Sequence, residues 1–221
     1  MNNSKKVIIF GTSGIAEIAN EYLTHDSDYE VACFTVEKDY IDSNTFQNRP
    51  LIPFEDIEIK FPPEKFKMFI ALGYKELNQL RARIYKDAEK RGYELISYIS
   101  SKAFVWKNVE IGKNCFIFED NTVQPYVKIG DNVTLWSGNH IGHHSIIRDN
   151  CFVSSHVVVS GYCEIKENCF LGVNSTIGHR TIIEKDCLVG MGAVVTKKTS
   201  PGRVYVGNPA KDLKKNSKDL L

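Results

Sequence analysis

The sequence predicts a two-domain chain in which a small parallel α/β domain, residues 1–100, precedes a solenoid of short parallel strands, residues 101–198. Three observations predict this fold class. Ala103 to Lys198 repeats every six residues without an insertion. The segment before it alternates apolar runs, glycine turns and amphipathic stretches, as parallel α/β folds do. Prolines and glycines then interrupt the repeat, which sets apart a C-terminal segment at residues 199–221.

The repeat is defined by its third position, which is aliphatic in all sixteen hexads. These residues are Val105, Ile111, Ile117, Val123, Ile129, Leu135, Ile141, Ile147, Val153, Val159, Ile165, Leu171, Ile177, Ile183, Val189 and Val195. The sixth position is often Asn, Asp or Gly, which tolerate the left-handed backbone of a corner. Neither a helix nor a straight strand keeps one face apolar at this period. We therefore expect coils of short strands that bury their aliphatics against one another.

Composition excludes several classes of function. The formal net charge is +1 over 221 residues, which gives no general reason to expect nucleic acid or an anionic membrane as a partner. No apolar run reaches the length of a membrane span, and the N-terminus lacks the features of a signal peptide. We expect a cytoplasmic protein.

The cysteines are expected in the core. Five of the six stand at the first position of a hexad, where a small inward-pointing residue is needed, and none forms a CxxC pair. Buried free cysteine usually behaves as a small hydrophobe. We expect neither disulfides nor a bound metal. The five are Cys115, Cys151, Cys163, Cys169 and Cys187.

The N-terminal domain begins with a strand, a glycine turn and a helix. Lys6–Phe10 is the apolar strand, Gly11, Ser13 and Gly14 lie in the turn, and an apolar period typical of a helix follows. Backbone N–H groups in such a turn can bind a phosphate, although the glycines can also serve only to close it.

The remainder of this domain predicts three more strands. They are residues 29–34, 66–73 and 94–99, with a mobile loop at 38–50 and a helix at 75–91 whose apolar face includes Leu77. Ligands of parallel sheets bind beyond the carboxyl ends of the strands. Thr35, Gly73 and Tyr74 follow the ends of such strands, as the first glycine turn does, so they are candidate ligand-binding residues.

Histidines give the repeat its candidate chemistry. Five of six lie within it, at positions 140, 143, 144, 156 and 179. A neutral imidazole on a corner is suited to take a proton from an amine or a hydroxyl group. No Asp or Glu stands at a ligand spacing in this stretch, so a zinc site is not favoured.

The C-terminal segment is predicted to form a lid over the last coil and a helix-capable basic tail. Basic residues are frequent at this end of the chain. They are expected either to form a solvated tail or to bind the phosphates of a ligand. They are Lys197, Lys198, Arg203, Lys211, Lys214 and Lys215.

The hexads, the short N-terminal domain and the closing VGNPAK sequence together resemble the sialic-acid O-acetyltransferase-like family of hexapeptide-repeat acyltransferases, which includes nucleotide-aminosugar N-acetyltransferases. The resemblance covers essentially the whole chain. It implies a left-handed parallel β-helix, three hexads to each triangular coil, and a homotrimer. Outward-facing phenylalanines such as Phe116, Phe152 and Phe170 would then need cover from neighbouring subunits.

The resemblance also implies roles for individual residues. His143 would be the general base, and His144 stands where relatives often carry an assisting Glu. Gly161, eighteen residues after His143, would offer its N–H to an oxyanion, and His179 follows one coil later. In some relatives a second histidine contacts the acetyl carbonyl. Phe152 stands at that position here, and His156 lies at the next corner of the coil.

Acetyl-CoA would bind between subunits. The resemblance places it along Gly161, Val173, Gly190 and Gly192, with the basic residues Lys197 and Lys198 nearby. The sugar nucleotide would lie at Gly11, Ser13 and Gly14.

The function predicted is an acetyl-CoA-dependent N-acetyltransferase acting on a dTDP- or UDP-linked amino-dideoxy sugar. Such sugars serve the biosynthesis of surface glycans such as the O-antigen of lipopolysaccharide. Two alternatives remain open, O-acetylation of a sugar hydroxyl and a non-catalytic β-helix that binds sugar nucleotides.

Overall fold

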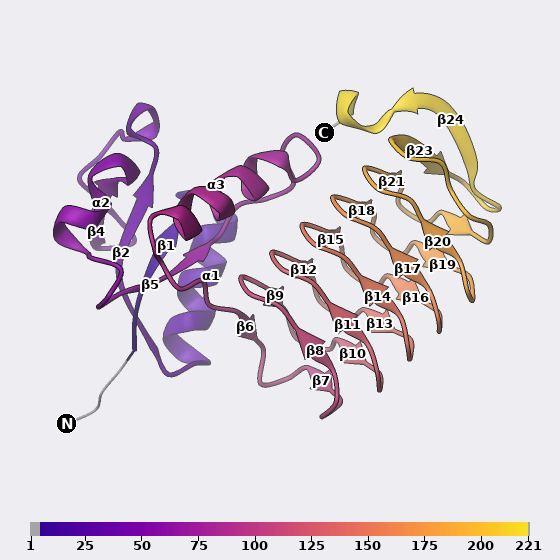
Figure 1. The fold of residues 1–221 in the computed structure, drawn as a ribbon, viewed down its shortest axis with the longest axis horizontal. Coiled ribbons are helices and arrows are strands. Elements are labelled where there is room, and N and C mark those ends of the chain that lie inside the picture. Colours follow the sequence, from indigo (N-terminus) through magenta and orange to yellow (C-terminus); the bar gives the residue numbers. More distant parts are fainter. Residues whose placement is uncertain (1–4, 221) are drawn as a thin grey trace. The chain divides into compact units, whose positions relative to one another are not determined.

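The computed structural model describes residues 5–220. It divides into two compact units (Figure 1). One extends to Gly73 and includes Arg83–Tyr98, and the other contains Tyr74–Ala82 and the chain from Ile99 onward.

The N-terminal unit is built on a five-stranded sheet of order β3-β4-β2-β1-β5. All neighbouring strands are parallel except β3 and β4. The strands are β1 (Lys5–Phe10), β2 (Tyr29–Val36), β3 (Thr45–Phe46), β4 (Arg49–Pro53) and β5 (Lys67–Ile70). The α-helices of the chain are α1 (Gly14–His25), α2 (Ile57–Lys60) and α3 (Gln79–Lys90), with 3-10 turns at η1 (Lys38–Tyr40) and η2 (Phe54–Asp56).

The first strand and helix form as the sequence predicts. Val7 to Phe10 are buried in β1, since this strand lies between two others. Helix α1 connects the parallel strands β1 and β2, which no tight hairpin can do. It buries Ala16, Ala19 and Leu23, which are spaced to fall on one helical face.

Two expectations for this unit are wrong. Residues 38–50, expected to be a mobile loop, contain η1, β3 and the start of β4. Leu51 in β4 is buried beside Phe34 of β2, so an apolar residue just beyond the expected loop anchors the strand. The expected strand at 94–99 is divided: Leu95 forms a single bridge to Met68, and Tyr98–Ile99 forms β6, which belongs to the β-helix.

Helix α3 begins four residues later than predicted. Glu76, Leu77 and Asn78 have φ angles of 55°, 50° and 66°. These left-handed values cannot continue a right-handed helix. Leu77, expected on the apolar face of the helix, is instead fully buried against Leu188 and Val204.

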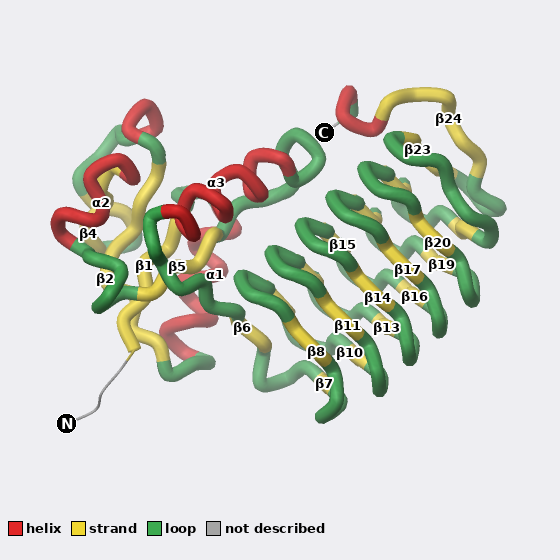
Figure 2. The backbone as a smooth tube through the Cα atoms, viewed as in Figure 1, coloured by secondary structure: helices red, strands yellow, loops and turns green. Residues whose placement is uncertain are grey.

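The second unit is a parallel β-helix of three stacked sheets, in which two-residue strands alternate with corners (Figure 2). The six-stranded sheet contains β7 (Phe104–Val105), β10 (Thr122–Val123), β13 (His140–Ile141), β16 (Val158–Val159), β19 (Thr176–Ile177) and β22 (Val194–Val195). The five-stranded sheet contains β8 (Glu110–Ile111), β11 (Lys128–Ile129), β14 (Ile146–Ile147), β17 (Glu164–Ile165) and β20 (Ile182–Ile183). The eight-stranded sheet contains β6 (Tyr98–Ile99), β9 (Phe116–Ile117), β12 (Thr134–Leu135), β15 (Phe152–Val153), β18 (Phe170–Leu171), β21 (Leu188–Val189), β23 (Arg203–Val206) and β24 (Lys211–Asn216).

The register of the sheets confirms three hexads in each coil. Paired residues are eighteen positions apart, as Thr122 and His140 are in one sheet and Lys128 and Ile146 in another. The stacked parallel sheets are consistent with the left-handed β-helix that the resemblance implies.

The side-chain pattern explains this geometry. The third-position aliphatics fill the interior, with only Val105 and Ile111 of the first coil left partly exposed. All five β-helix cysteines are buried and free, as predicted. Sixth-position residues such as Asn132 and Asn150 have the left-handed φ that their corners require, and their side chains hydrogen bond from coil to coil.

One expectation about exposed surface is wrong. Phe116 and Phe152 are only 3% and 2% exposed. The chain itself provides cover, because the Tyr74 ring lies edge-on to Phe152 and Phe170 at 5.0 and 4.9 Å. These phenylalanines therefore give no argument for a trimer.

A buried arginine attaches the same segment to the β-helix. The Arg81 guanidinium is 1% exposed and donates hydrogen bonds to the Thr134 hydroxyl and the Cys151 carbonyl oxygen. Burial lowers the pKa of Arg81 to about 10.

The C-terminal tail is a hairpin and not the expected helix. Strand β23 pairs in parallel with β21, the last coil strand of the eight-stranded sheet. Strand β24 then returns antiparallel to β23 and forms the edge of that sheet. A 3-10 turn, η3 (Ser217–Asp219), follows.

Candidate active site

His143 lies on the corner between β13 and β14, where both neighbouring coils hold its backbone. Its N–H donates to Gln124 Oε1 at 2.9 Å, and its carbonyl oxygen accepts from the Tyr162 N–H at 3.0 Å. The side chain is half-buried. The corner thus presents the imidazole from a fixed backbone.

Gly161 lies directly above His143 in the next coil. A Cβ at Gly161 would lie 2.9 Å from both Cε1 and Nε2 of His143, so a side chain at this position would displace the ring. No acceptor for the Gly161 N–H exists among residues 5–220. The pair thus combines a possible base with an N–H donor that the fold leaves available.

Gly142 keeps the same N–H uncovered. A Cβ there would lie 2.6 Å from the nitrogen of Gly161. Our sequence analysis missed this residue. The signal was present, because Gly142 and Gly161 are separated by one coil plus a single position.

The other histidines are distributed differently. His144 is exposed, and its Nδ1 lies 3.1 Å from Nδ1 of His143. The His179 ring lies edge-on to Tyr162 at 5.8 Å, and Arg180 donates its N–H to the Gly161 carbonyl oxygen, which continues the ridge. His156 lies on another corner, over Gly138.

Of the residues predicted to bind acetyl-CoA, Val173, Gly190 and Gly192 lie at the opposite edge of the six-stranded sheet from His143, whereas Gly161, Lys197 and Lys198 follow strands of that sheet at the same edge as His143. Val173 is exposed on the corner after β18, and it accepts the Gly192 N–H at 2.8 Å. Gly190 donates to the Tyr205 carbonyl oxygen. One chain therefore brings these three residues together but not beside His143.

The two lysines of this set differ in their availability. Lys197 and Lys198 are both exposed. Lys198 forms an ion pair with Glu184 at 3.0 Å, and Glu184 also pairs with Lys166 at 2.9 Å. Hydrogen bonds from Lys166 and Lys198 lower the pKa of Glu184.

The glycine turn of the N-terminal unit lies at the carboxyl edge of its sheet. Gly11 has a φ of 131°, and a Cβ there would lie 2.7 Å from the Ala71 carbonyl oxygen. Its N–H donates to the Thr35 carbonyl oxygen at 2.9 Å. Ser13, the N-cap of α1, and Gly14 are both exposed.

The remaining predicted substrate residues are less available. The Thr35 hydroxyl is buried and donates to the Ile52 carbonyl oxygen at 2.8 Å. A Cβ at Gly73 would lie 3.2 Å from Ile15 Cδ1. Tyr74 belongs to the β-helix unit, where its ring packs as described above.

The carboxylate after β2 is paired. Glu37 accepts two hydrogen bonds from Arg83, at 2.8 and 3.0 Å, and these hold the pKa of Glu37 below its usual value. Arg83 is a residue that our sequence analysis missed, because it stands forty-six positions after Glu37 in the chain.

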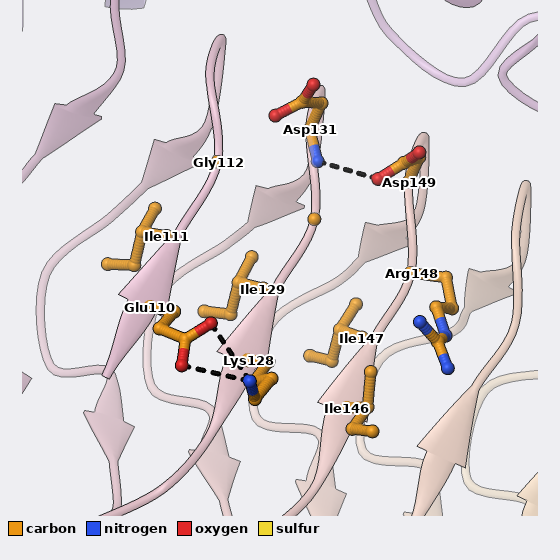
Figure 3. Close-up of a pocket in the computed structure, with 11 residues that line it drawn as sticks. Glu110, Ile111, Gly112, Lys128, Ile129, Asp131, Ile146, Ile147, Arg148 and Asp149 are labelled. Carbon is orange, nitrogen blue, oxygen red and sulfur yellow. Dashed lines mark hydrogen bonds and ion pairs between the residues drawn. The ribbon is translucent and has the colours of Figure 1, made fainter. Parts of the chain in front are cut away.

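Two hollows of the surface lie away from the residues described above. One of about 390 Å³ lies on the five-stranded sheet of the β-helix (Figure 3), where Gly112 and Gly130 carry no side chains. Its Asp131 and Asp149 carboxylates accept backbone N–H groups at 2.8 Å, so they are part of the corner structure. Another of about 370 Å³ lies by Lys5, where β1 begins, at the far end of that strand from Gly11.

The described residues, 5–220, contain no cluster of three or more His, Cys, Asp or Glu side chains able to hold a metal ion. None of the helices in this range is long and apolar enough to cross a membrane.

Comparisons with solved structures define the class of fold. Perosamine N-acetyltransferase from Caulobacter crescentus, in complex with CoA and GDP-perosamine, is 22% identical with a TM-score of 0.86, over 95% of this chain and 97% of that one. WeeI from Acinetobacter baumannii AYE is 23% identical with a TM-score of 0.72, over 94% and 99%. The acetyltransferase domain of PglB from Neisseria gonorrhoeae is 21% identical with a TM-score of 0.59, over 95% and 100%.

The chain therefore has the fold of the hexapeptide-repeat acyltransferases, and at the level of fold the predicted resemblance is confirmed. A family model described as the GMPPB C-terminal domain matches residues 96–219, and the chain belongs to this family. A search of curated proteins found no match.

Proposed function

We propose that this protein is an acetyl-CoA-dependent N-acetyltransferase that acts on the amino group of a nucleotide-linked sugar. The observation that carries the proposal is the pairing of His143 with Gly161. An imidazole nitrogen faces a glycine whose N–H has no acceptor among residues 5–220. The solved structure of perosamine N-acetyltransferase, which contains CoA and GDP-perosamine, supports this choice of substrates.

In the proposed reaction the sugar amine attacks the thioester carbonyl carbon of acetyl-CoA. His143 Nε2 takes a proton from the amine as the new C–N bond forms. The Gly161 N–H donates to the carbonyl oxygen as it becomes an oxyanion. The C–S bond then breaks, the carbonyl re-forms, and the proton passes from His143 to the departing CoA sulfur.

Direct transfer is favoured over an acyl-cysteine intermediate. All the cysteines of the β-helix are buried. Burial raises the pKa of Cys163, Cys169 and Cys187, so these groups remain thiols and are poor nucleophiles.

The positions of His143 and of the acetyl-CoA residue Val173 suit a homotrimer. Because His143 and Val173 lie on opposite edges of the six-stranded sheet, a second copy is needed to bring the two edges together. That sheet also carries exposed apolar residues on its outer face, with Phe104 54%, Trp106 41% and Val158 39% exposed. We propose that acetyl-CoA binds between neighbouring copies, along Val173, Gly190 and Gly192 and near Lys197 and Lys198.

The sugar nucleotide is proposed to bind at the glycine turn of the N-terminal unit. Ser13 and Gly14 are exposed at the start of α1, where backbone N–H groups favour a phosphate. The products of such a reaction would enter surface-glycan biosynthesis.

A panel assay tests the proposed function. Acetyl-CoA is offered with GDP-, dTDP- and UDP-linked amino sugars and their hydroxyl counterparts, and products are followed by mass spectrometry. An added acetyl group on an amine is the expected result. Acetylation of the hydroxyl counterparts alone would replace it with O-acetylation, and no acetylation of any substrate would favour a binding protein.

His143→Asn tests the assigned base. We expect kcat to fall by about 10²–10⁴-fold, the usual contribution of a positioned proton acceptor. KM for both substrates should change little, because the imidazole acts mainly in the transition state. The matched control is His156→Asn, on a different corner, and loss of activity in this variant alone would move the base to His156.

A further inference from the structure

His144 is held between two aromatic rings. Its imidazole stacks on Tyr126 at 4.6 Å and 28°, and on Tyr162 at 4.8 Å and 16°. All three residues occupy the sixth position of successive coils and have left-handed φ values of 64°, 59° and 60°. The shared backbone conformation brings the ring faces into register.

The outer side of this stack carries a cation. The Arg180 guanidinium lies 4.8 Å from the centre of the Tyr162 ring, and the His179 ring meets the same tyrosine edge-on. Tyr126 and Tyr162 are 58% and 44% exposed, and their hydroxyl groups form no hydrogen bond within the described chain. Their contribution to the stack therefore comes from their ring faces.

The two ring nitrogens of His143 have different neighbours. Nδ1 lies 3.1 Å from Nδ1 of His144, so one of these nitrogens donates and the other accepts. Nε2 lies on the side of Gly161. For Nε2 to accept a proton, the hydrogen of the neutral His143 ring must be on Nδ1, and His144 must be the acceptor.

This hydrogen bond strengthens as the reaction proceeds. When Nε2 has taken the proton of the amine, His143 is a cation and its Nδ1–H donates to the neutral His144 ring. A hydrogen bond from a charged donor is shorter and stronger than the neutral bond that it replaces. The gain appears in the transition state, so it raises kcat more than it changes the affinity for substrates.

We infer that His144 is a positioning residue for His143, and that Tyr126 and Tyr162 hold His144 in the orientation that accepts the Nδ1–H. This role rests on the proposed function, in which His143 is the base. An exposed imidazole without the two rings would rotate freely and lose the bond.

Three variants test the inference in steady-state kinetics. His144→Gly removes the acceptor at a position where glycine is tolerated, since Gly138 and Gly192 occupy the same place in other hexads with φ of 77° and 67°. Tyr126→Asn/Tyr162→Asn removes the rings and keeps a residue suited to the corner. Tyr126→Phe/Tyr162→Phe is the matched control, because it keeps both ring faces.

We expect kcat to fall by about 10- to 100-fold in the glycine variant, the value of one hydrogen bond to a charged group. The double Asn variant should show a smaller loss in the same direction, and the double Phe variant should match the wild type. KM for both substrates should stay constant in all three. A wild-type kcat in the glycine variant, in a protein that needs His143, would overturn the inference and leave the proposed function standing.

A spectroscopic measurement decides the question even if no acetylation is found. Nitrogen-15 NMR of labelled histidine in the free protein should show the neutral His143 ring protonated on Nδ1. That preference should be lost in His144→Gly and kept in the double Phe variant. A wild-type His143 ring protonated on Nε2 would reverse the direction of the bond and overturn the inference. A ring protonated on Nδ1 without any acetylation would retain the positioning and remove the proposed function.

Discussion

At the scale of single residues, the site depends on glycines as much as on histidines. Gly161 contributes an N–H and the absence of a side chain, and Gly142 keeps that N–H uncovered. A pattern of histidines can be recognised in a sequence from residue type alone. The space that a glycine leaves for a ring one coil away is visible only after the register of eighteen residues is known.

Gly161→Ala tests this directly. Its new Cβ would lie 2.9 Å from two atoms of the His143 ring, closer than side chains approach, so the ring must move. We expect kcat to fall by at least about 10-fold with little change in thermal stability, since a misplaced catalytic group costs more rate than folding energy. The measurement is kcat beside a melting curve.

The control for this variant is Gly178→Ala, whose new Cβ would meet its nearest neighbours at an ordinary 3.4 Å. It should retain wild-type kcat. Equal losses in both variants would show that the ridge tolerates no side chain for general structural reasons, and that Gly161 has no special relation to His143.

At the scale of elements, the sequence was informative where one physical rule acts alone. Every third-position aliphatic points inward because the six-residue period leaves no other way to bury it, and the predicted strands follow it closely. Helix α3 was harder, because Leu77 fits a helical face equally well. Its true partners, Leu188 and Val204, lie more than a hundred residues away and cannot be found from local periodicity.

The N-terminal sheet shows the same limit. A segment of polar residues at 38–50 looked irregular, yet Leu51 and the neighbouring strand β2 were enough to order part of it as β-structure. Outside a repeat, strands of two to five residues carry too little periodicity to be distinguished from a loop. Tertiary contacts decide such cases.

The ion pairs of Glu184, which join neighbouring coils, predict how the stability of the β-helix depends on pH. Hydrogen bonds from Lys166 and Lys198 hold the pKa of Glu184 below its unfolded value. A carboxyl group of this kind adds stability above its unfolded pKa, and the contribution disappears as the pH falls through the lower, folded pKa. Glu184→Gln should therefore melt at a lower temperature than the wild type at neutral pH.

The difference between the two proteins should shrink as the pH falls through the lowered pKa of Glu184, because the wild-type carboxylate then takes up its proton and loses the two hydrogen bonds from lysine. Glu167→Gln is the control, because that side chain is exposed and makes no ion pair within the described chain. Its melting temperature should follow the wild type at every pH. A constant difference between Glu184→Gln and the wild type would assign the effect to packing.

At the scale of the whole molecule, the trimer is the first prediction. Of the phenylalanines expected to need subunit cover, Phe152 and Phe170 pack against Tyr74 of the same chain and Phe116 is buried, so the argument now rests on the six-stranded sheet. Phe104, Trp106 and Val158 are exposed there. Light scattering at micromolar concentration should give three times the mass of one chain, whereas a monomer would leave the proposed acetyl-CoA groove with only one wall.

A variant locates the interface. Val158→Glu places a charge on the outer face of the six-stranded sheet, in the inner strand β16, and it should lower the mass measured by light scattering. Ile182→Glu, on the five-stranded sheet, is the comparable change outside the proposed interface and should leave the mass unchanged. Dissociation by Ile182→Glu alone would move the interface to the five-stranded sheet.

The last prediction separates the two substrates between the two units. Gly14 is the residue to change, because a Cβ there meets nothing within 4 Å, whereas one at Gly11 would strike the Ala71 carbonyl oxygen at 2.7 Å and disturb the fold. A bulky side chain in Gly14→Phe would cover the N–H groups at the start of α1. We expect KM for the sugar nucleotide to rise by about 10-fold or more, the loss of one or two charge-assisted hydrogen bonds, while KM for acetyl-CoA stays constant. The corresponding change in the other unit is Gly192→Tyr, because a Cβ there also meets nothing within 4 Å and tyrosine already adopts the left-handed φ of this hexad position at Tyr126 and Tyr162; it should raise KM for acetyl-CoA alone. Reversed effects of the two variants would mean that the sites are assigned to the wrong units, and a rise in both constants from either change would mean that one unit binds both substrates.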